Sequence, residues 1–146
     1  MKRDEALAAL SRDHHLTLVV AQRLRRADDD GAAVARERFL EHWEEHARRH
    51  FRIEEEILLP AFAAYGDAHD PLVLRVLGDH VAIRRRAEDL AGHPAPALDE
   101  LHELGEGLAA HVRLEERELF PLIEQAMPAD ALTALAQRLD EAESQR

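Results

Sequence analysis

Apolar residues recur along the chain at intervals of three and four, the spacing that places side chains on one face of an α-helix. In the first such segment, about residues 4–27, the apolar stripe runs through Leu7, Leu10 and Leu18. Later stripes occupy about residues 32–65, the stretch between Pro71 and Gly92, the stretch from Leu101 to Leu122, and about residues 129–143. The pattern predicts four long helices followed by a short fifth one.

Proline and acidic residues mark the boundaries of these segments. Asp70 can cap the third helix, and Pro71 suits its first turn because a residue there needs no N–H bond within the helix. Pro60 lies inside the second segment, where it predicts a kink or an early end near Leu59. The connections are short, so successive helices are expected to pack as antiparallel neighbours. The predicted fold is an all-α, up-down-up-down four-helix bundle.

One domain is expected to account for the whole chain, because 146 residues is the length of a typical single domain. We assign residues 1–146 to this domain, with the bundle at about 4–127 and a short tail helix at about 129–143. The tail helix carries an apolar stripe, which favours packing against the bundle over a contact between two copies. The residues of that stripe are Leu132, Leu135 and Leu139.

A sequence repeat relates the two halves of the bundle. Residues 50–60 read HFRIEEEILLP and residues 111–121 read HVRLEERELFP, and the two are identical at six of eleven positions. The helices that precede these motifs also match, since Asp13-His14 corresponds to Asp79-His80. The bundle is therefore expected to consist of two related helix hairpins.

Each copy of the repeat has a histidine and a glutamate four residues apart, so the two side chains lie one above the other on a helix face. Both pairs fall on apolar stripes and should point into the bundle, as should one histidine on the first helix and one on the third. Burying two carboxylates without partners is costly, and a pair of divalent cations would compensate them. The candidate metal ligands are His14, His50, Glu54, His80, His111 and Glu115.

The ligand types restrict the metal. The chain contains no cysteine, so a metal here must be bound by nitrogen and oxygen atoms. Imidazole and carboxylate suit iron, manganese or zinc, and the cores of helix bundles commonly hold two-metal carboxylate sites. The alternative is a metal-free core in which protonated histidines pair with the glutamates.

The chain resembles the hemerythrin-like, or HHE cation-binding, family over about residues 7–122. The resemblance rests on Asp13-His14, on His50-Phe51 with Glu54-Glu55, on Asp79-His80, and on His111 with Glu115-Glu116. It implies a non-haem centre of two iron ions inside a four-helix bundle. It further implies that the two glutamates bridge the metals and that the four histidines are terminal ligands, which here would be Glu54, Glu115, His14, His50, His80 and His111.

The third helix departs from the family pattern. Oxygen-carrying hemerythrins have a His-x-x-x-His pair on this helix, whereas the positions four residues from His80 are Val76 and Arg84. One ligand that the resemblance implies is therefore missing. The best substitute is His46, four residues before His50 on the same stripe, either as a ligand or as a hydrogen-bond donor beside the ligands.

Three other residues are candidates for additional roles. His15 could replace His14, but an α-helix turns it about 100° away from the stripe, so we favour His14. Glu55 and Glu116 directly follow two predicted ligands. We expect these two acids to be exposed or to support the ligands, and to bind metal only if the helix shifts.

Charge and hydropathy exclude several partners. The formal net charge of −11 opposes binding to nucleic acid. No apolar run is long enough to span a membrane, and residues 1–5 lack the apolar core of a signal peptide, so a cytoplasmic protein is expected. The sequence leaves open whether the protein is a monomer or a homodimer.

Three functions fit the predicted site. The first is a di-iron protein that binds O₂, peroxide or nitric oxide for sensing, storage or scavenging; the altered third helix weakens the case for a dedicated oxygen carrier. The second is a di-iron enzyme of the peroxidase or nitric oxide reductase type, for which the sequence offers no catalytic residue. The third is a bundle in which the metal is only structural. We favour the first function.

Overall fold

The regular structure is helical throughout the part of the chain that the computed structural model describes, residues 3–145. This confirms the all-α prediction. A short 3₁₀ turn, Glu5–Leu7, precedes the first helix. The α-helices are α1 (Ala8–Arg25), α2 (Ala32–His42), α3 (Arg48–Ile53), α4 (Leu59–Ala63), α5 (Pro71–Ala91), α6 (Leu98–Leu114), α7 (Phe120–Ala126) and α8 (Ala129–Ser144).

Two of the predicted helices are each built from several of these elements, joined by single π-helical turns. The turn Trp43–Ala47 joins α2 to α3, and Glu54–Leu58 joins α3 to α4. The turn Glu115–Leu119 joins α6 to α7. A π turn holds an extra residue and is frequently found at functional sites. The bundle therefore consists of α1, α2 to α4, α5, and α6 to α7.

Pro60 does not end its helix, which continues to Ala63, so of the two expected alternatives, a kink or an early end near Leu59, the early end is wrong. The π turn before the proline explains the difference. Leu59 N–H donates to the carbonyl oxygen of Glu54, five residues earlier, and this wider turn accommodates a following residue that has no N–H. The second copy of the repeat behaves in the same way, with a π turn directly before the helix that contains Pro121.

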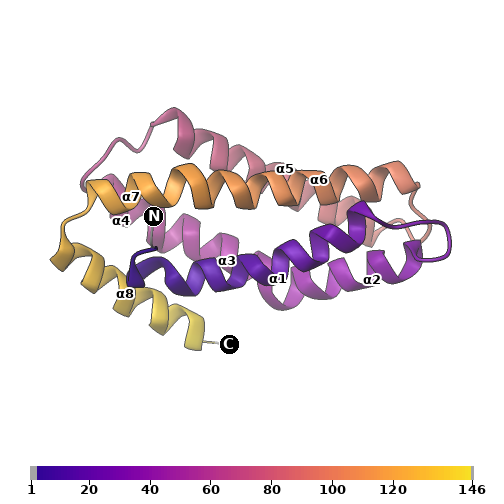
Figure 1. Cartoon of the computed structure of the whole chain (residues 1–146), viewed down its shortest axis with the longest axis horizontal. Helices are drawn as coiled ribbons and strands as arrows, with labels where there is room; N and C mark the ends of the chain where they lie inside the picture. The colour runs from indigo at the N-terminus through magenta and orange to yellow at the C-terminus, as the bar shows by residue number, and fades with distance from the viewer. Residues whose placement is uncertain (1–2, 146) are drawn as a thin grey trace.

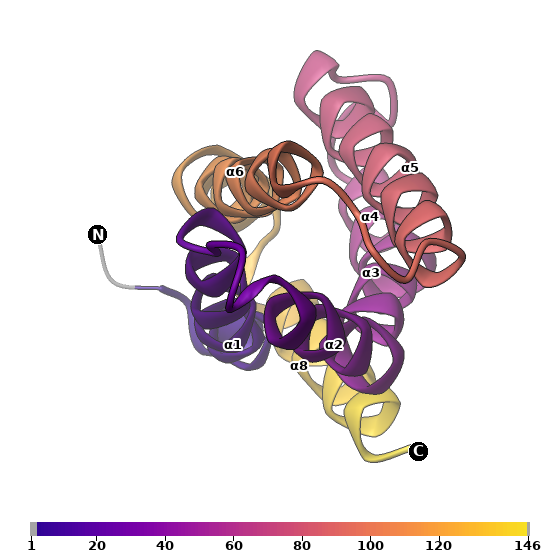
Figure 2. The same ribbon diagram turned by 90° about the vertical axis from the view of Figure 1, so that its right-hand side faces the viewer.

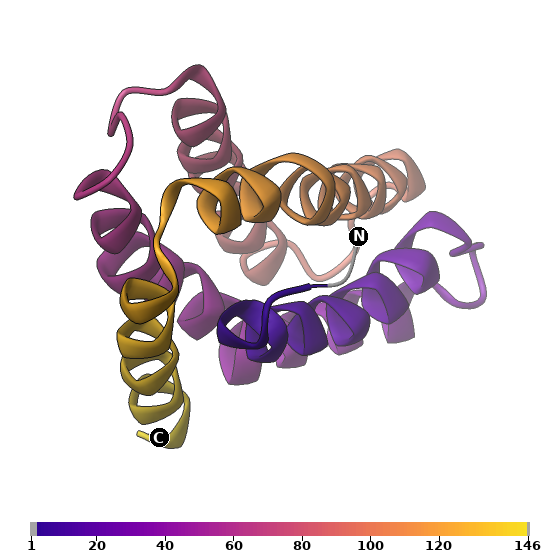
Figure 3. The same ribbon diagram turned by 60° about the vertical axis from the view of Figure 1, so that its left-hand side comes forward.

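The four long helices lie side by side and alternate in direction, as Figure 1 shows. Viewed along the bundle, they surround a common interior (Figure 2). The tail helix α8 leaves the end of α7 and crosses that end of the bundle, away from the α5–α6 connection (Figure 3). No helix in the described range 3–145 is long and apolar enough to cross a membrane.

The apolar core is divided into two clusters. One lies at the end that α8 covers and includes Leu7, Leu58 and Phe120. The other lies toward the opposite end and includes Phe39 and Leu101. The tail-helix stripe belongs to the first cluster, where its leucines are buried, so it packs against the bundle as expected. The members of that stripe are Leu132, Leu135 and Leu139.

Helix α6 approaches α1 closely at Gly105. A Cβ atom added there would lie 2.7 Å from the carbonyl oxygen of Ala21 and 2.9 Å from the backbone nitrogen of Arg25. Backbone atoms cannot move aside as a flexible side chain can, so only glycine fits this contact. At Gly107, two residues further along α6, an added Cβ would meet nothing within 4 Å.

These two glycines predict opposite effects of the same substitution. Gly105→Ala should lower the free energy of unfolding by about 1–3 kcal/mol, because it forces two helix backbones apart. Gly107→Ala should raise it by about 0.5–1 kcal/mol, because alanine is the better helix former and meets no obstacle. Urea unfolding followed by circular dichroism measures both. Equal effects at the two positions would contradict the close contact at Gly105.

Candidate metal centre

A layer of six polar side chains separates the two apolar clusters. We call it the polar layer. Every long helix contributes to it, and both glutamates are completely buried, with 0% of their surface exposed. Its members are His14 on α1, His50 on α3, Glu54 at the start of a π turn, His80 on α5, His111 on α6 and Glu115 at the start of another π turn.

The first half of the polar layer contains His14 and His50. The Nε2 atom of His14 lies 2.9 Å from Oε1 of Glu115, and Nε2 of His50 lies 3.2 Å from Oε2 of Glu54. One ligand atom from each of these four residues lies within 4.8 Å of the others. This spacing is short enough for one metal ion to contact all four.

The second half contains His80 and His111 and uses the same two glutamates. Nε2 of His80 lies 3.2 Å from Oε1 of Glu54, and Nε2 of His111 lies 3.0 Å from Oε2 of Glu115. These four residues also bring ligand atoms within 4.8 Å of one another. Each glutamate thus offers one oxygen to each half.

The hydrogen bonding inside the layer is incomplete without a metal. Both oxygens of Glu54, one oxygen of Glu115 and the Nε2 atoms of three histidines are buried without a hydrogen-bond partner. Buried polar atoms normally have partners, and leaving them unpaired is costly. Cations bound between the carboxylate oxygens and the Nε2 atoms would satisfy them. The histidines concerned are His50, His80 and His111.

A second set of carboxylates holds the other nitrogen of each histidine. We call Asp13, Glu55, Asp79 and Glu116 the outer carboxylates. Metal-binding histidines characteristically donate their second N–H to such a group, which fixes the ring and directs the other nitrogen at the metal. The Nδ1 distances are 2.6 Å from His14 to Glu116, 3.0 Å from His50 to Asp13, 2.7 Å from His80 to Glu55 and 3.0 Å from His111 to Asp79.

These contacts link every long helix to the next in a closed ring. Asp13 on α1 holds a histidine of α3, Glu55 holds one of α5, Asp79 on α5 holds one of α6, and Glu116 holds one of α1. Glu54 and Glu55 are consecutive, as are Glu115 and Glu116. Because consecutive helical residues point about 100° apart, one faces the centre and the other reaches a neighbouring helix.

Of the additional candidates, Glu55 and Glu116 lie beside the polar layer, whereas His46 and His15 do not. The side chain of His46 is 37% exposed, and its ring lies 5.7 Å from that of His42. His46 lies within the π turn Trp43–Ala47, and the extra residue in that turn disturbs the regular spacing that would align His46 with His50. His15 is exposed on α1.

The sequence alone did not identify the roles of Asp13 and Asp79. Each aspartate directly precedes a histidine of the polar layer, yet each holds the histidine of a different helix. The repeated Asp-His pair was the available signal, but the partner depends on how the helices pack.

Comparison with known protein families gives a match over nearly the whole chain. The Hemerythrin HHE cation-binding domain matches residues 5–143. The chain belongs to this family. No curated protein and no solved structure matches it. Hemerythrin domains bind metal cations, and the buried histidines and glutamates of this hemerythrin domain fit such a site.

Charge in the polar layer shifts the pKa values of its members. Burial lowers the pKa of His80, but the carboxylates of Glu115 and Glu54 beside Nε2 outweigh it and raise that pKa to about 9. Burial also lowers the pKa of His111, while the charge of Glu115 and the hydrogen bond to Asp79 raise it to about 10. Burial raises the pKa of Glu115, yet His111 and other histidines hold it well below its usual range. A metal must therefore displace protons from these histidines.

The raised histidine pKa values predict how the stability of the metal-free hemerythrin domain depends on pH. The contribution of His80 and His111 is complete below their ordinary pKa of 6.5 and is lost as the pH rises through about 9 and 10. After chelation, the melting temperature should therefore fall between pH 6.5 and pH 10. A His69→Gln/His93→Gln variant, changed only at exposed histidines, should show the same fall. A constant melting temperature would contradict the ion-paired arrangement.

The outer carboxylates predict a loss of metal affinity when one is neutralised. Glu55→Gln removes the charge beside Nδ1 of His80 and should weaken metal binding about ten- to a hundredfold. Glu56→Gln is the matched control, since the exposed Glu56 forms an ion pair with Arg52 on its own helix, at 3.6 Å, and with no other residue of the described range 3–145. Anaerobic titration with ferrous iron measures both dissociation constants. Equal constants would show that Glu55 does not support His80.

Proposed function

We propose that this hemerythrin domain holds two iron ions that share Glu54 and Glu115, and that it binds O₂, peroxide or nitric oxide. The observation that carries the proposal is the pair of four-ligand groups, each with two histidines, that have both carboxylates in common. Two unrelated sites would not share both glutamates. The ligands in the first group are His14 and His50, and those in the second are His80 and His111.

The donor set is one that suits iron. Nitrogen and carboxylate ligands without thiolate suit non-haem iron, with zinc and manganese as the alternatives. Two histidines and two shared carboxylates give each ion four protein ligands, which leaves positions open to a small molecule. Bound ferrous ions would bind O₂, peroxide or nitric oxide at these open positions and would supply the electrons for the reaction.

The protein's part is to hold the ligands and limit the access of water. The outer carboxylates accept from the Nδ1–H of each histidine, so Nε2 faces the centre and would offer its lone pair to a metal that displaces its proton. Phe51 stacks on His80, with ring centroids 3.9 Å apart and the planes 7° from parallel. Phe120 stacks on His14, with centroids 5.4 Å apart. These rings shield the histidines from solvent and hold their orientation.

Sensing, storage or scavenging by binding is the use that this geometry supports best. The histidines and carboxylates at the centre are candidate metal ligands, and the histidines are also hydrogen-bonded to the outer carboxylates. An oxygen carrier of the family would have a further histidine on α5, where this chain has Val76 and Arg84. Arg84 instead binds Glu55, at 3.2 Å, and thereby supports His80 from outside.

Iron loading tests the proposal directly. Protein loaded anaerobically with ferrous iron should hold two irons per chain by elemental analysis and develop iron charge-transfer absorption on exposure to air. His50→Ala/His111→Ala removes one histidine from each group and should lose both properties. His69→Ala/His93→Ala, which changes two exposed histidines, should retain both.

Other results would change the proposal in defined ways. Little bound iron in the unchanged protein would overturn the di-iron site. Two irons without any spectral response to O₂, peroxide or nitric oxide would leave the metal a structural role. Repeated turnover of peroxide or nitric oxide would instead identify an enzyme.

A further inference from the structure

The four outer carboxylates differ in what lies beside them in addition to their histidine. Glu116 accepts from Ser11, at 2.8 Å, and Glu55 binds Arg84. Asp13 lines a depression together with Glu143 of α8. Within residues 3–145, Asp79 makes a side-chain hydrogen bond or ion pair with His111 alone. It is also the most exposed of the four, at 37% of its side chain.

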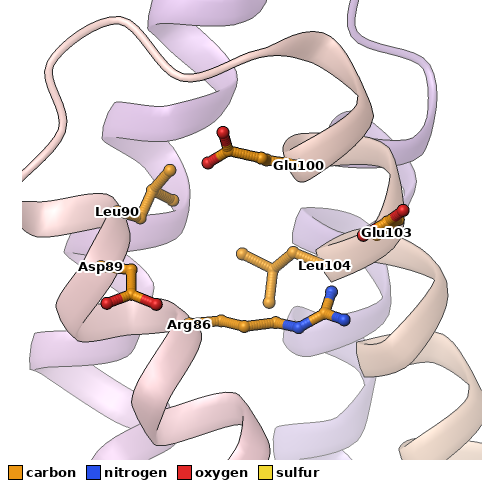
Figure 4. A pocket seen from close by; sticks show the side chains of 6 residues that line it. All are labelled: Arg86, Asp89, Leu90, Glu100, Glu103 and Leu104. Carbon is orange, nitrogen blue, oxygen red and sulfur yellow. The ribbon is translucent and has the colours of Figure 1, made fainter.

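Asp79 opens onto a groove between α5 and α6. A depression of about 210 Å³ has Asp79 and Gly107 in its walls and Ile83 in its lining. A second depression of about 270 Å³ continues it toward the α5–α6 connection, and the two share Arg86 and Leu104. We call the pair the α5–α6 groove. Figure 4 shows the outer depression, with Leu104 near its middle and Arg86 along one edge.

The groove has an acidic rim over an apolar floor. Asp89, Glu100 and Glu103 line the outer depression together with Arg86 (Figure 4), and a second cation, Arg85, lies 3.2 Å from Asp89. Leu90 and Leu104, which are 3% and 2% exposed, form the floor. Charges of one sign above a low-dielectric surface focus the field and raise the local concentration of oppositely charged ions. The groove therefore attracts cations and leads them toward Asp79.

We propose that the α5–α6 groove is the route by which a hydrated divalent metal ion reaches the polar layer, with Asp79 as the first carboxylate that it contacts near the site. This inference rests on the proposed function, because it requires metal to be bound between the histidines. The His111 side chain separates an ion at Asp79 from the centre of the polar layer, since Asp79 holds Nδ1 of His111 at 3.0 Å. Arg86, which both depressions share, opposes the passage of cations and slows it.

The other outer carboxylates are less suitable for admitting a cation. Arg3 lies 3.6 Å from Glu116, and Arg84 lies 3.2 Å from Glu55, so positive charge covers both. Asp13 lines a depression with Asp140 and Glu143, but Arg12 also lines it and Arg49 lies 3.5 Å from Glu143, so positive charge is present there too. That depression is the competing route, and a charge reversal at the exposed Asp140 tests it.

Two substitutions of exposed helical glycines provide a steric test. Gly107→Leu places a side chain in the α5–α6 groove, whereas Gly78→Leu places one on α5 outside the groove, and neither Cβ meets an atom within 4 Å. The rate at which anaerobically added ferrous iron becomes resistant to a brief chelator pulse is measured. Gly107→Leu should load about tenfold more slowly than Gly78→Leu, with the same iron content at equilibrium.

A pair of charge reversals tests the electrostatic part. Glu103→Lys on the groove rim should slow loading about tenfold at low ionic strength, and the difference should shrink as salt is added. Asp140→Lys, which makes the same change of charge beside the competing depression, should load at the unchanged rate. Arg86→Gln should load faster.

The outcomes separate this inference from the function on which it rests. Unchanged protein that binds no iron would overturn both. Full iron binding with equal loading rates for Gly107→Leu and Gly78→Leu would overturn the route alone, as would slow loading in Asp140→Lys. Slow loading confined to Gly107→Leu and Glu103→Lys, with normal final iron content, would support it.

Discussion

The rest of the structure depends on the burial of two carboxylates, Glu54 and Glu115, at mid-bundle. Ionised groups with no exposed surface require compensating charge close by, and four imidazoles supply it in the metal-free state. Each imidazole in turn needs an acceptor for Nδ1, which the outer carboxylates provide. Charge therefore alternates outward from the centre, and each long helix is tied to its neighbours by the same contacts. This layer divides the apolar core into two clusters.

The local helix geometry follows from the same requirement. A uniform α-helix places consecutive side chains about 100° apart, so a pair such as Glu54 and Glu55 can serve the centre and the adjacent helix at once. A π turn begins at each buried glutamate and is followed closely by a proline, Pro60 or Pro121. The wider turn absorbs the missing N–H of the proline without ending the helix. The functional residue and the helix irregularity therefore occur at the same place in both halves.

The sequence predicted the helices and the six members of the polar layer because both depend on regular spacing. Helix periodicity reports which residues face inward, and the repeat showed that two His-x-x-x-Glu pairs do so together. The spacing also suggested that His46 lies beside the ligands, and there it misled, because the spacing of a uniform helix does not apply across the π turn Trp43–Ala47. Helix periodicity also could not predict the roles of Asp13 and Asp79. Whether an aspartate holds the histidine beside it or one on the next helix is decided by packing between helices, which no single segment encodes.

The repeat makes the inner site nearly two-fold symmetric, so differences between its halves must arise outside it. Both halves have two histidines and the same two glutamates. Their surroundings differ, because α8 has no counterpart in the other half and brings Glu143 to Asp13, while the equivalent Asp79 faces a groove. A change near Asp79 alters the hydrogen bond to His111 and thus how strongly that nitrogen can bind metal. The exposed side of α5 and α6, rather than the nearly symmetric centre, is therefore where this domain can acquire properties of its own.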